Sequence, residues 1–196
     1  MSKRNLAVAG LAVAAALLVA AAPASASAAS ATSAASHPLK LRNGLTLSLP
    51  SSWKVYGKGD WIHVVTGKCA KPKGAYFTPE CDGFWVLGPA AVKVGHELNP
   101  YTPDRPFYSA TDVEPCPLNH KWGQVLNGAA AKGLRQVGPG HKAYYRAWKG
   151  TCVTGTGKVR ARFVQREWYL PKTGVLVVDA WNTPGLSGVL KHAVWR

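Results

Sequence analysis

Acidic side chains are scarce in this sequence. Only 9 Asp and Glu stand against 24 Lys and Arg among 196 residues, which gives a formal net charge of +15. Because these carboxyl groups are also scattered along the chain, a glycosidase with two paired carboxylates has few candidates. An H-E-x-x-H zinc motif, a nucleophile elbow, a phosphate-binding loop and a dinucleotide fingerprint are all missing. The sequence therefore indicates no reaction, and we expect no cofactor.

Long apolar runs are confined to the start of the chain. Lys3 and Arg4 precede an apolar run from Leu6 to Ala22, and small residues follow it at 23–26. This order is typical of a secretory signal peptide, so we expect residues 1–26 to be removed. The run is short and Ala-rich for a core of about 30 Å, and no later segment is apolar enough to span a membrane. We expect a secreted protein, free or associated with the cell wall, with no stable membrane insertion.

The remaining chain divides into a linker and one domain. Residues 27–36 are almost all Ala, Ser and Thr and are predicted to form a flexible linker. Residues 37–196 are long enough for one substantial hydrophobic core. The hydrophobic content of 47% and the aromatic content of 10% exclude a disordered chain despite the charge.

Four cysteines lie in this domain, at positions 69, 81, 116 and 152. An even number in an exported protein favours two disulfides, for which three pairings are open. We favour Cys69–Cys81, which closes a Gly- and Pro-rich loop, and Cys116–Cys152, which ties a long loop to a later strand. The alternative is a metal site with Cys116 and His120, but a zinc site usually needs a second close pair, which the sequence lacks.

The apolar pattern predicts an α+β fold with a mainly antiparallel sheet, stabilised by disulfides. Alternation and turn residues predict strands at 39–42, 45–49, 61–65, 84–87, 141–149, 158–169 and 175–181. Helical spacing predicts helices at 121–136 and 184–195. Three internal glycines weaken the first helix, whereas Thr183 and Pro184 suit the start of the second.

Three segments resemble a known layout. They are GLTLSLPSSWKV at 44–55, GHKAYYRAWKG at 140–150 and GVLVVDAWNTPGLSGVLKHAVW at 174–195. The chain resembles exported actinobacterial domains of unknown function, and its layout is similar to the PsbP/Mog1-type α/β/α sandwich. The resemblance implies a fold, but it implies no reaction and no catalytic residue.

The positive charge is concentrated in the second half of the domain. Residues 37–120 have a net charge of +2, whereas residues 121–196 have +11. If the two strands at 141–149 and 158–169 align suitably, they form one basic face with interleaved aromatic residues. The predicted binding residues are Arg146, Trp148, Arg160, Arg162 and Arg166. Such a face suits an anionic cell-wall polymer or an acidic protein, and nucleic acid is a less favoured ligand.

Other functions remain open at this point. A small secreted hydrolase is one: a nuclease could use His141 and Glu167 as an acid/base pair, and a wall enzyme could use Ser51 of an S-x-x-K motif. A protease inhibitor presenting the loop at 98–117 is another. The sorting-signal pattern at Leu170–Gly174 lacks the long apolar segment that should follow it, so a turn between two strands is the favoured interpretation.

Overall fold

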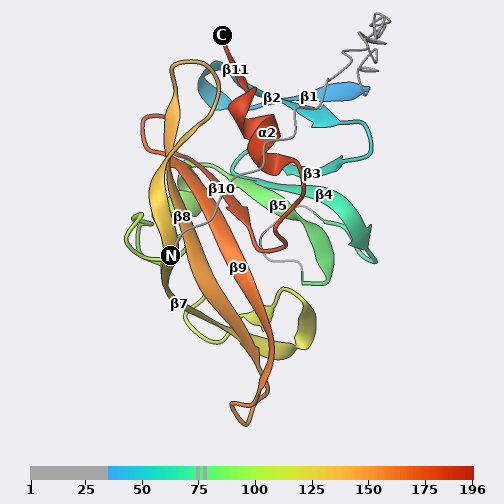
Figure 1. Ribbon diagram of the computed structural model, residues 1–196, viewed down its shortest axis with the longest axis vertical. Helices are drawn as coiled ribbons and strands as arrows, with labels where there is room; N and C mark the ends of the chain where they lie inside the picture. Colours follow the sequence, from blue (N-terminus) through green and yellow to red (C-terminus); the bar gives the residue numbers. More distant parts are fainter. Residues whose placement is uncertain (1–34, 74–75, 77–78) are drawn as a thin grey trace, which may run out of the picture. The chain divides into compact units, whose positions relative to one another are not determined.

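Antiparallel β-sheet dominates this protein. The structure, a computed structural model, describes residues 35–73, 76 and 79–196. The expected signal peptide at 1–26, and the expected linker as far as residue 34, lie outside the described residues. The rest forms an eight-stranded sheet, a three-stranded sheet and two short helices (Figure 1).

The large sheet is antiparallel throughout, and most of its neighbouring strands are joined by tight turns. In spatial order its strands are β3 (Lys54–Lys58), β4 (Trp61–Cys69), β5 (Cys81–Leu87), β10 (Val175–Asp179), β9 (Val159–Leu170), β8 (Lys142–Val153), β7 (Asn119–Gln136) and β6 (Pro115–Cys116). The expected strands at 61–65, 84–87, 141–149, 158–169 and 175–181 correspond to β4, β5, β8, β9 and β10.

The small sheet contains β1 (Ser36–Lys40), β2 (Leu45–Pro50) and β11 (Val194–Trp195), with β2 in the centre. The expected strands at 39–42 and 45–49 correspond to β1 and β2, which form an antiparallel hairpin joined by a 3-10 turn at Arg42–Gly44. Asn43 and Gly44 have φ angles of 53° and 76°, and Asn and Gly tolerate this left-handed region best.

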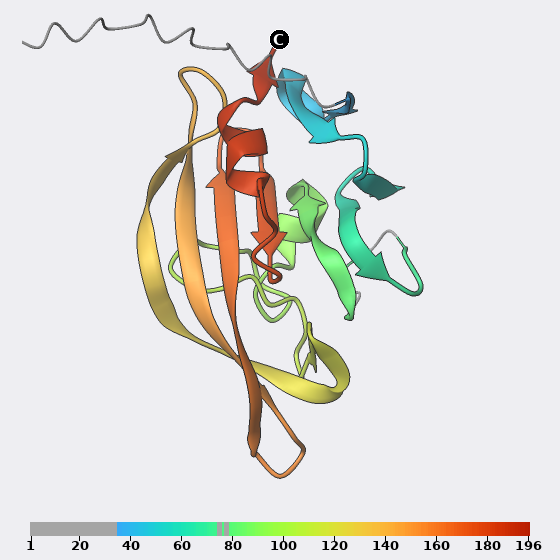
Figure 2. The same cartoon turned by 45° about the vertical axis from the view of Figure 1, so that its right-hand side comes forward.

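The large sheet has two differently covered faces. We call one the helix face, because α2 (Leu186–Lys191) and the small sheet cover it through a core that includes Phe84, Trp168 and Val177. We call the other the loop face. The segment 88–116, which begins with α1 (Pro89–Lys93), covers it through a second core around Trp85 and Phe107. Figure 2 shows α2 against the sheet below the small sheet.

Both expected disulfides are present. Cys69 pairs with Cys81 across the β4–β5 connection, and Cys116 pairs with Cys152 of β8. The second bond joins the end of the loop-face segment to the far half of the sheet, over a sequence separation of 36 residues.

The predicted helix at 121–136 is wrong, because these residues belong to β7. The spacing of the apolar residues Trp122, Val125, Leu126 and Ala129 fits a helix. Most of this segment is exposed, however, so a helix there would have no apolar side packed against a core. Gly123, Gly128 and Gly133 would each cost a helix about 1 kcal/mol relative to Ala. The Cys116–Cys152 bond also holds the preceding residues beside β8, where strand pairing satisfies the backbone.

The predicted helix at 184–195 is too long. The helix α2 spans only Leu186–Lys191, and Gly185 precedes it with a φ angle of 80°. The next residues leave the helix because Val194 and Trp195 pair with β2, and the Trp195 indole donates a hydrogen bond of 2.7 Å to Val137 O. With one expected helix absent and the other short, the fold is β-rich rather than a balanced α+β sandwich. No helix among the described residues is long and apolar enough to cross a membrane.

Candidate functional site: a basic half-sheet

The far half of the large sheet is built from a segment without carboxyl groups. Between Glu114 and Glu167 the chain has no Asp or Glu, but it has ten Lys and Arg. This segment forms β6, β7, β8 and most of β9. In the part of the chain that the structure describes, only Arg166 among these ten forms an ion pair. The excess positive charge therefore belongs to one contiguous half of the sheet.

Four of these cations cluster near the turn between β8 and β9. We call this cluster the basic hairpin, and it consists of Lys149, Lys158, Arg160 and Arg162. All four residues are exposed. Figures 1 and 2 both show the turn projecting from the lower end of the sheet, beyond the other strands. Because these side chains are exposed, an extended ligand could contact them.

The strand pleat and a β-bulge decide on which face of the sheet each cation of the basic hairpin lies. Arg162 pairs with Thr151 and Lys149 pairs with Val164, which places Lys149 and Arg162 on the helix face beyond the small sheet. Arg160 lies where the pairing of β8 and β9 shifts. Its guanidinium lies 5.5 Å from the centre of the Trp122 ring, a cation–π contact that holds the charge close to an aromatic surface.

The register does not align the five predicted binding residues on one face. Arg146 pairs with Glu167 and Trp148 pairs with Gln165, and these residues lie on the loop face. Arg166, which pairs with Ala147, lies on the opposite, helix face together with Arg162. The condition for a single basic and aromatic face is therefore not met, because a shift of one residue in register exchanges the two faces.

Arg166 is held inside the domain. Its Nε donates a hydrogen bond of 2.9 Å to the buried Asp179 carboxylate, with which it also forms an ion pair, and its Nη2 donates to Thr183 O at 3.0 Å. The guanidinium also lies 5.4 Å from the centre of the Trp168 ring. Asp179 in turn accepts hydrogen bonds from the backbone N–H groups of Trp181 and Thr183. Arg166 thus fixes the connection between β10 and α2.

Glu167 is completely buried under the loop-face segment, and four groups donate hydrogen bonds to it. Oε2 accepts from the Tyr101 hydroxyl and the Trp148 indole, both at 2.8 Å. Oε1 accepts from Phe107 N at 2.7 Å and from the Gln165 amide at 2.8 Å. Burial raises the pKa of Glu167 although these donors favour its charged form. The Glu167 carboxylate thus holds the Pro-rich loop against the sheet, and the Trp148 indole is one of its four hydrogen-bond donors.

The residues of the other candidate sites are not assembled into a reactive arrangement. His141 stacks on Trp195, with ring centres 4.1 Å apart, and Nδ1 contacts Pro139 O. No contact joins it to Glu167 among the described residues. Ser51 is an exposed turn residue after β2. The Leu170–Gly174 segment forms the turn between β9 and β10, as expected, with Thr173 N donating to Leu170 O at 3.1 Å.

Two further candidate groups have structural partners. The sulfur of Cys116 is in a disulfide, and His120 contacts Glu80 at 2.6 Å, so the two do not form a metal-binding pair. The loop at 98–117 buries Tyr101 and Phe107 against the loop face instead of presenting them to solvent.

No protein-family model, curated protein or solved structure matches this chain.

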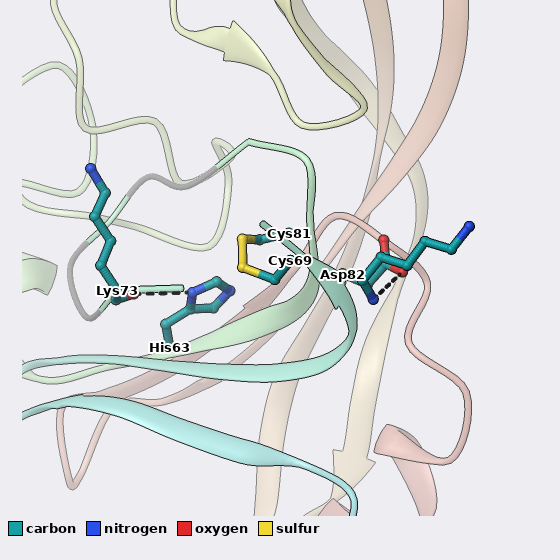
Figure 3. The surroundings of a disulfide bond; sticks show 6 residues. His63, Cys69, Lys73, Cys81 and Asp82 are labelled. Carbon is teal, nitrogen blue, oxygen red and sulfur yellow. Dashed lines mark hydrogen bonds between the residues drawn. A yellow bond between two sulfur atoms is a disulfide. The ribbon is translucent and has the colours of Figure 1, made fainter. Parts of the chain in front are cut away.

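A buried histidine in the other half of the sheet has no counterpart in the sequence-based predictions. His63 of β4 is fully buried and stacks on Trp85 with ring centres 5.0 Å apart. Its Nδ1 contacts Lys73 O at 3.2 Å, and Nε2 has no hydrogen-bond partner among the described residues. Burial lowers the pKa of His63. Figure 3 shows the ring beside the Cys69–Cys81 disulfide. Only its place inside an apolar strand could have indicated this burial.

Proposed function

We propose that this protein binds an anionic polymer outside the cell through its basic hairpin. The observation that supports this function is the absence of any carboxylate from residues 115–166, together with four exposed cations on the β8–β9 hairpin, whose turn projects from the sheet. Lys149, Lys158, Arg160 and Arg162 have no ion-pair partner within the described chain. Their charges are therefore available to phosphate or carboxylate groups of a ligand.

An extended polymer suits this surface better than a small molecule. The cations are spread along two strands and a turn, not gathered in a closed cavity, so each would contact a separate charged group of the ligand. Arg160 over Trp122 also offers an aromatic surface on which a sugar ring could stack. Binding of this kind is driven largely by the release of counterions and weakens steeply as salt is added.

The test is sedimentation of the protein with native cell walls over a series of salt concentrations, with walls stripped of teichoic acid as the reference. We expect salt-sensitive pelleting that disappears when the teichoic acid is removed. In the Arg160→Gln/Arg162→Gln variant, the slope of the logarithm of the binding constant against the logarithm of salt should fall by roughly one to two.

A matched control keeps this result specific. Lys54→Gln/Lys58→Gln removes the same number of charges from β3, at the opposite edge of the sheet, and should leave pelleting unchanged. Equal loss in the two variants would mean that only net charge matters. No pelleting of the unmodified protein at low salt would contradict the proposed function.

A further inference from the structure

The outer edge of β7 has no strand beside it over most of its length. Along its inner edge β7 pairs with β8 from Gly123 to Gln136. On the outer side, β6 pairs only with Asn119 and Gly123, and Gln124 N donates to Glu114 O at 2.9 Å. Beyond Gln124 in the described chain, no hydrogen bond from another strand reaches the outer side, where only the Arg135 guanidinium donates to Leu134 O, at 3.2 Å. Figure 2 shows no strand or helix beyond the part of β7 that follows its short pairing with β6.

Only the second part of this edge is a regular template. Register shifts interrupt the pairing between Leu126 and Ala129 and again between Ala129 and Ala131. Such irregularities reduce the ability of an edge to accept another strand. From Ala131 to Gln136, by contrast, each residue has its direct partner on β8, from Ala147 to Lys142. We call residues 131–136 the open edge.

The open edge has a defined pattern of exposed side chains. On the loop face, Lys132 lies beside Arg146, and Leu134 lies beside Tyr144. Leu134 is 52% exposed and Tyr144 is 43% exposed, so the two form an apolar spot next to two cations. Arg135, which pairs with Ala143, lies on the helix face.

We propose that the open edge accepts an extended acidic segment of another protein, which pairs with β7 as an additional antiparallel strand. Backbone hydrogen bonds would provide the affinity, as in other cases of strand addition, and side chains at alternate positions would provide the specificity. An acidic occupant follows from charge complementarity, because the open edge has two cations and no carboxylate lies between residues 115 and 166. A second copy of this chain would bring together two edges that each have cations and no carboxylate.

The pattern also predicts the sequence of the added strand. Antiparallel to β7, its residues meet Arg135, Leu134, Gly133 and Lys132 in that order. The complementary order is acidic, apolar, any residue, acidic. The apolar residue would extend the row formed by Leu134 and Tyr144, and the second acidic residue would lie beside Lys132 and near Arg146. This inference uses a surface separate from the basic hairpin, so it holds or fails independently of polymer binding.

The first test measures binding of a fluorescein-labelled peptide with a Glu-Ile-Thr-Glu centre to the whole protein by fluorescence anisotropy. We expect saturable binding, together with slower amide hydrogen exchange in residues 131–136. Two N-methylated forms of the peptide separate strand addition from charge attraction. Methylation of N–H groups that face β7 should abolish binding, and methylation of the alternate groups should not. Equal binding of the two forms, or no binding of the parent peptide, would overturn the proposal.

Charge reversal provides a second test that misfolding cannot imitate. The Lys132→Glu/Arg135→Glu variant should bind the acidic peptide about tenfold to a hundredfold more weakly and gain binding to the Lys-Ile-Thr-Lys peptide. Lys54→Glu/Lys58→Glu makes the same charge change on β3 and should keep the original preference. Retained preference in the first variant would contradict the proposal. Self-association of the unmodified protein that the peptide does not disrupt would identify a second copy as the occupant instead.

Discussion

The two edges of the large sheet differ in how open they are to pairing with a further strand. At one end β3 has 5 residues, exposed Lys54 and Lys58 mark its two ends, and Asp60 follows it closely. Near the other end, β7 has 18 residues and only the two-residue β6 lies beyond it; residues 131–136 form the open edge, and no carboxylate lies near them in the sequence. Short length and flanking lysines protect an edge against further pairing. The contrast indicates that β3 ends the sheet, whereas β7 leaves it ready for extension.

Each half of the large sheet also buries one polar side chain on the loop face, and the two side chains belong to the same cross-strand row. One cross-strand row on the loop face runs through His63, Trp85, Val178, Glu167 and Arg146. In the β3 half the buried group is His63, which has one hydrogen-bond contact among the described residues. In the β7 half it is Glu167, which has four. The β7 half therefore depends more strongly on its buried polar group.

Replacement of Glu167 should have the largest effect on stability. In Glu167→Ala, four buried donors lose their acceptor, and we expect the free energy of unfolding to fall by about 3–5 kcal/mol. Glu167→Gln keeps one acceptor oxygen and should lose less. Urea unfolding followed by tryptophan fluorescence measures both values. If both variants were as stable as the unmodified protein, the cluster would not hold the loop-face segment to the sheet.

Removal of single disulfides should rank next and compare the two halves directly. Chain entropy predicts a loss of about 4 kcal/mol for Cys116→Ser/Cys152→Ser and about 3 kcal/mol for Cys69→Ser/Cys81→Ser, because the first bond closes the longer loop. Hydrogen exchange should also become faster at the start of β7 only in the first variant. Thermal unfolding of the two variants checks the order. The reverse order would show that local packing, rather than loop length, decides the contribution of each bond.

The effect of His63 should be the smallest of the three and should depend on pH. Burial lowers its pKa in the folded state, so the unfolded chain binds more protons there as the pH falls below the ordinary value near 6.5. Stability should therefore be lost as the solution becomes mildly acidic. The raised pKa values of Glu114 and Glu167 act in the opposite direction. The effect is thus measured as the difference between the unmodified protein and His63→Gln in urea unfolding from neutral to mildly acidic pH, and parallel curves would exclude it.

Local patterns were sufficient for part of the fold. Alternation along β8 and β9 predicts these strands, and a short apolar run predicts β10, which is buried between the two cores. Asn43 and Gly44 predict the first turn because both accept a positive φ angle. Three disulfide pairings were open from the sequence, and the favoured one, in which each bond closes a loop, is confirmed. The same approach fails for the segment 121–136. Because β7 is mostly exposed, the positions of its apolar residues do not follow the alternation of a strand with one buried face.

The candidate site depends on information that local patterns do not contain. Whether Arg146 and Arg162 share a face is decided by the register of β8 against β9, which a turn and a bulge set together. Local patterns also cannot reveal the hydrogen-bond partners of Glu167, since Tyr101 lies 66 residues away in the chain. The sequence locates the excess charge in the second half of the domain. The basic hairpin and the open edge can be told apart only when the pairing of β7, β8 and β9 is known.

The two-residue strand β11 has a consequence for how this chain acquires its structure. Val194 and Trp195 close the small sheet on β2, and Arg196 N donates to Gly44 O at 3.1 Å. In the large sheet, β5 likewise pairs with the distant β10, because Trp85 pairs with Val178, 93 residues later in the chain. Contacts between such distant segments form slowly. The small sheet and the centre of the large sheet can therefore be completed only after β10 and β11 have been synthesised.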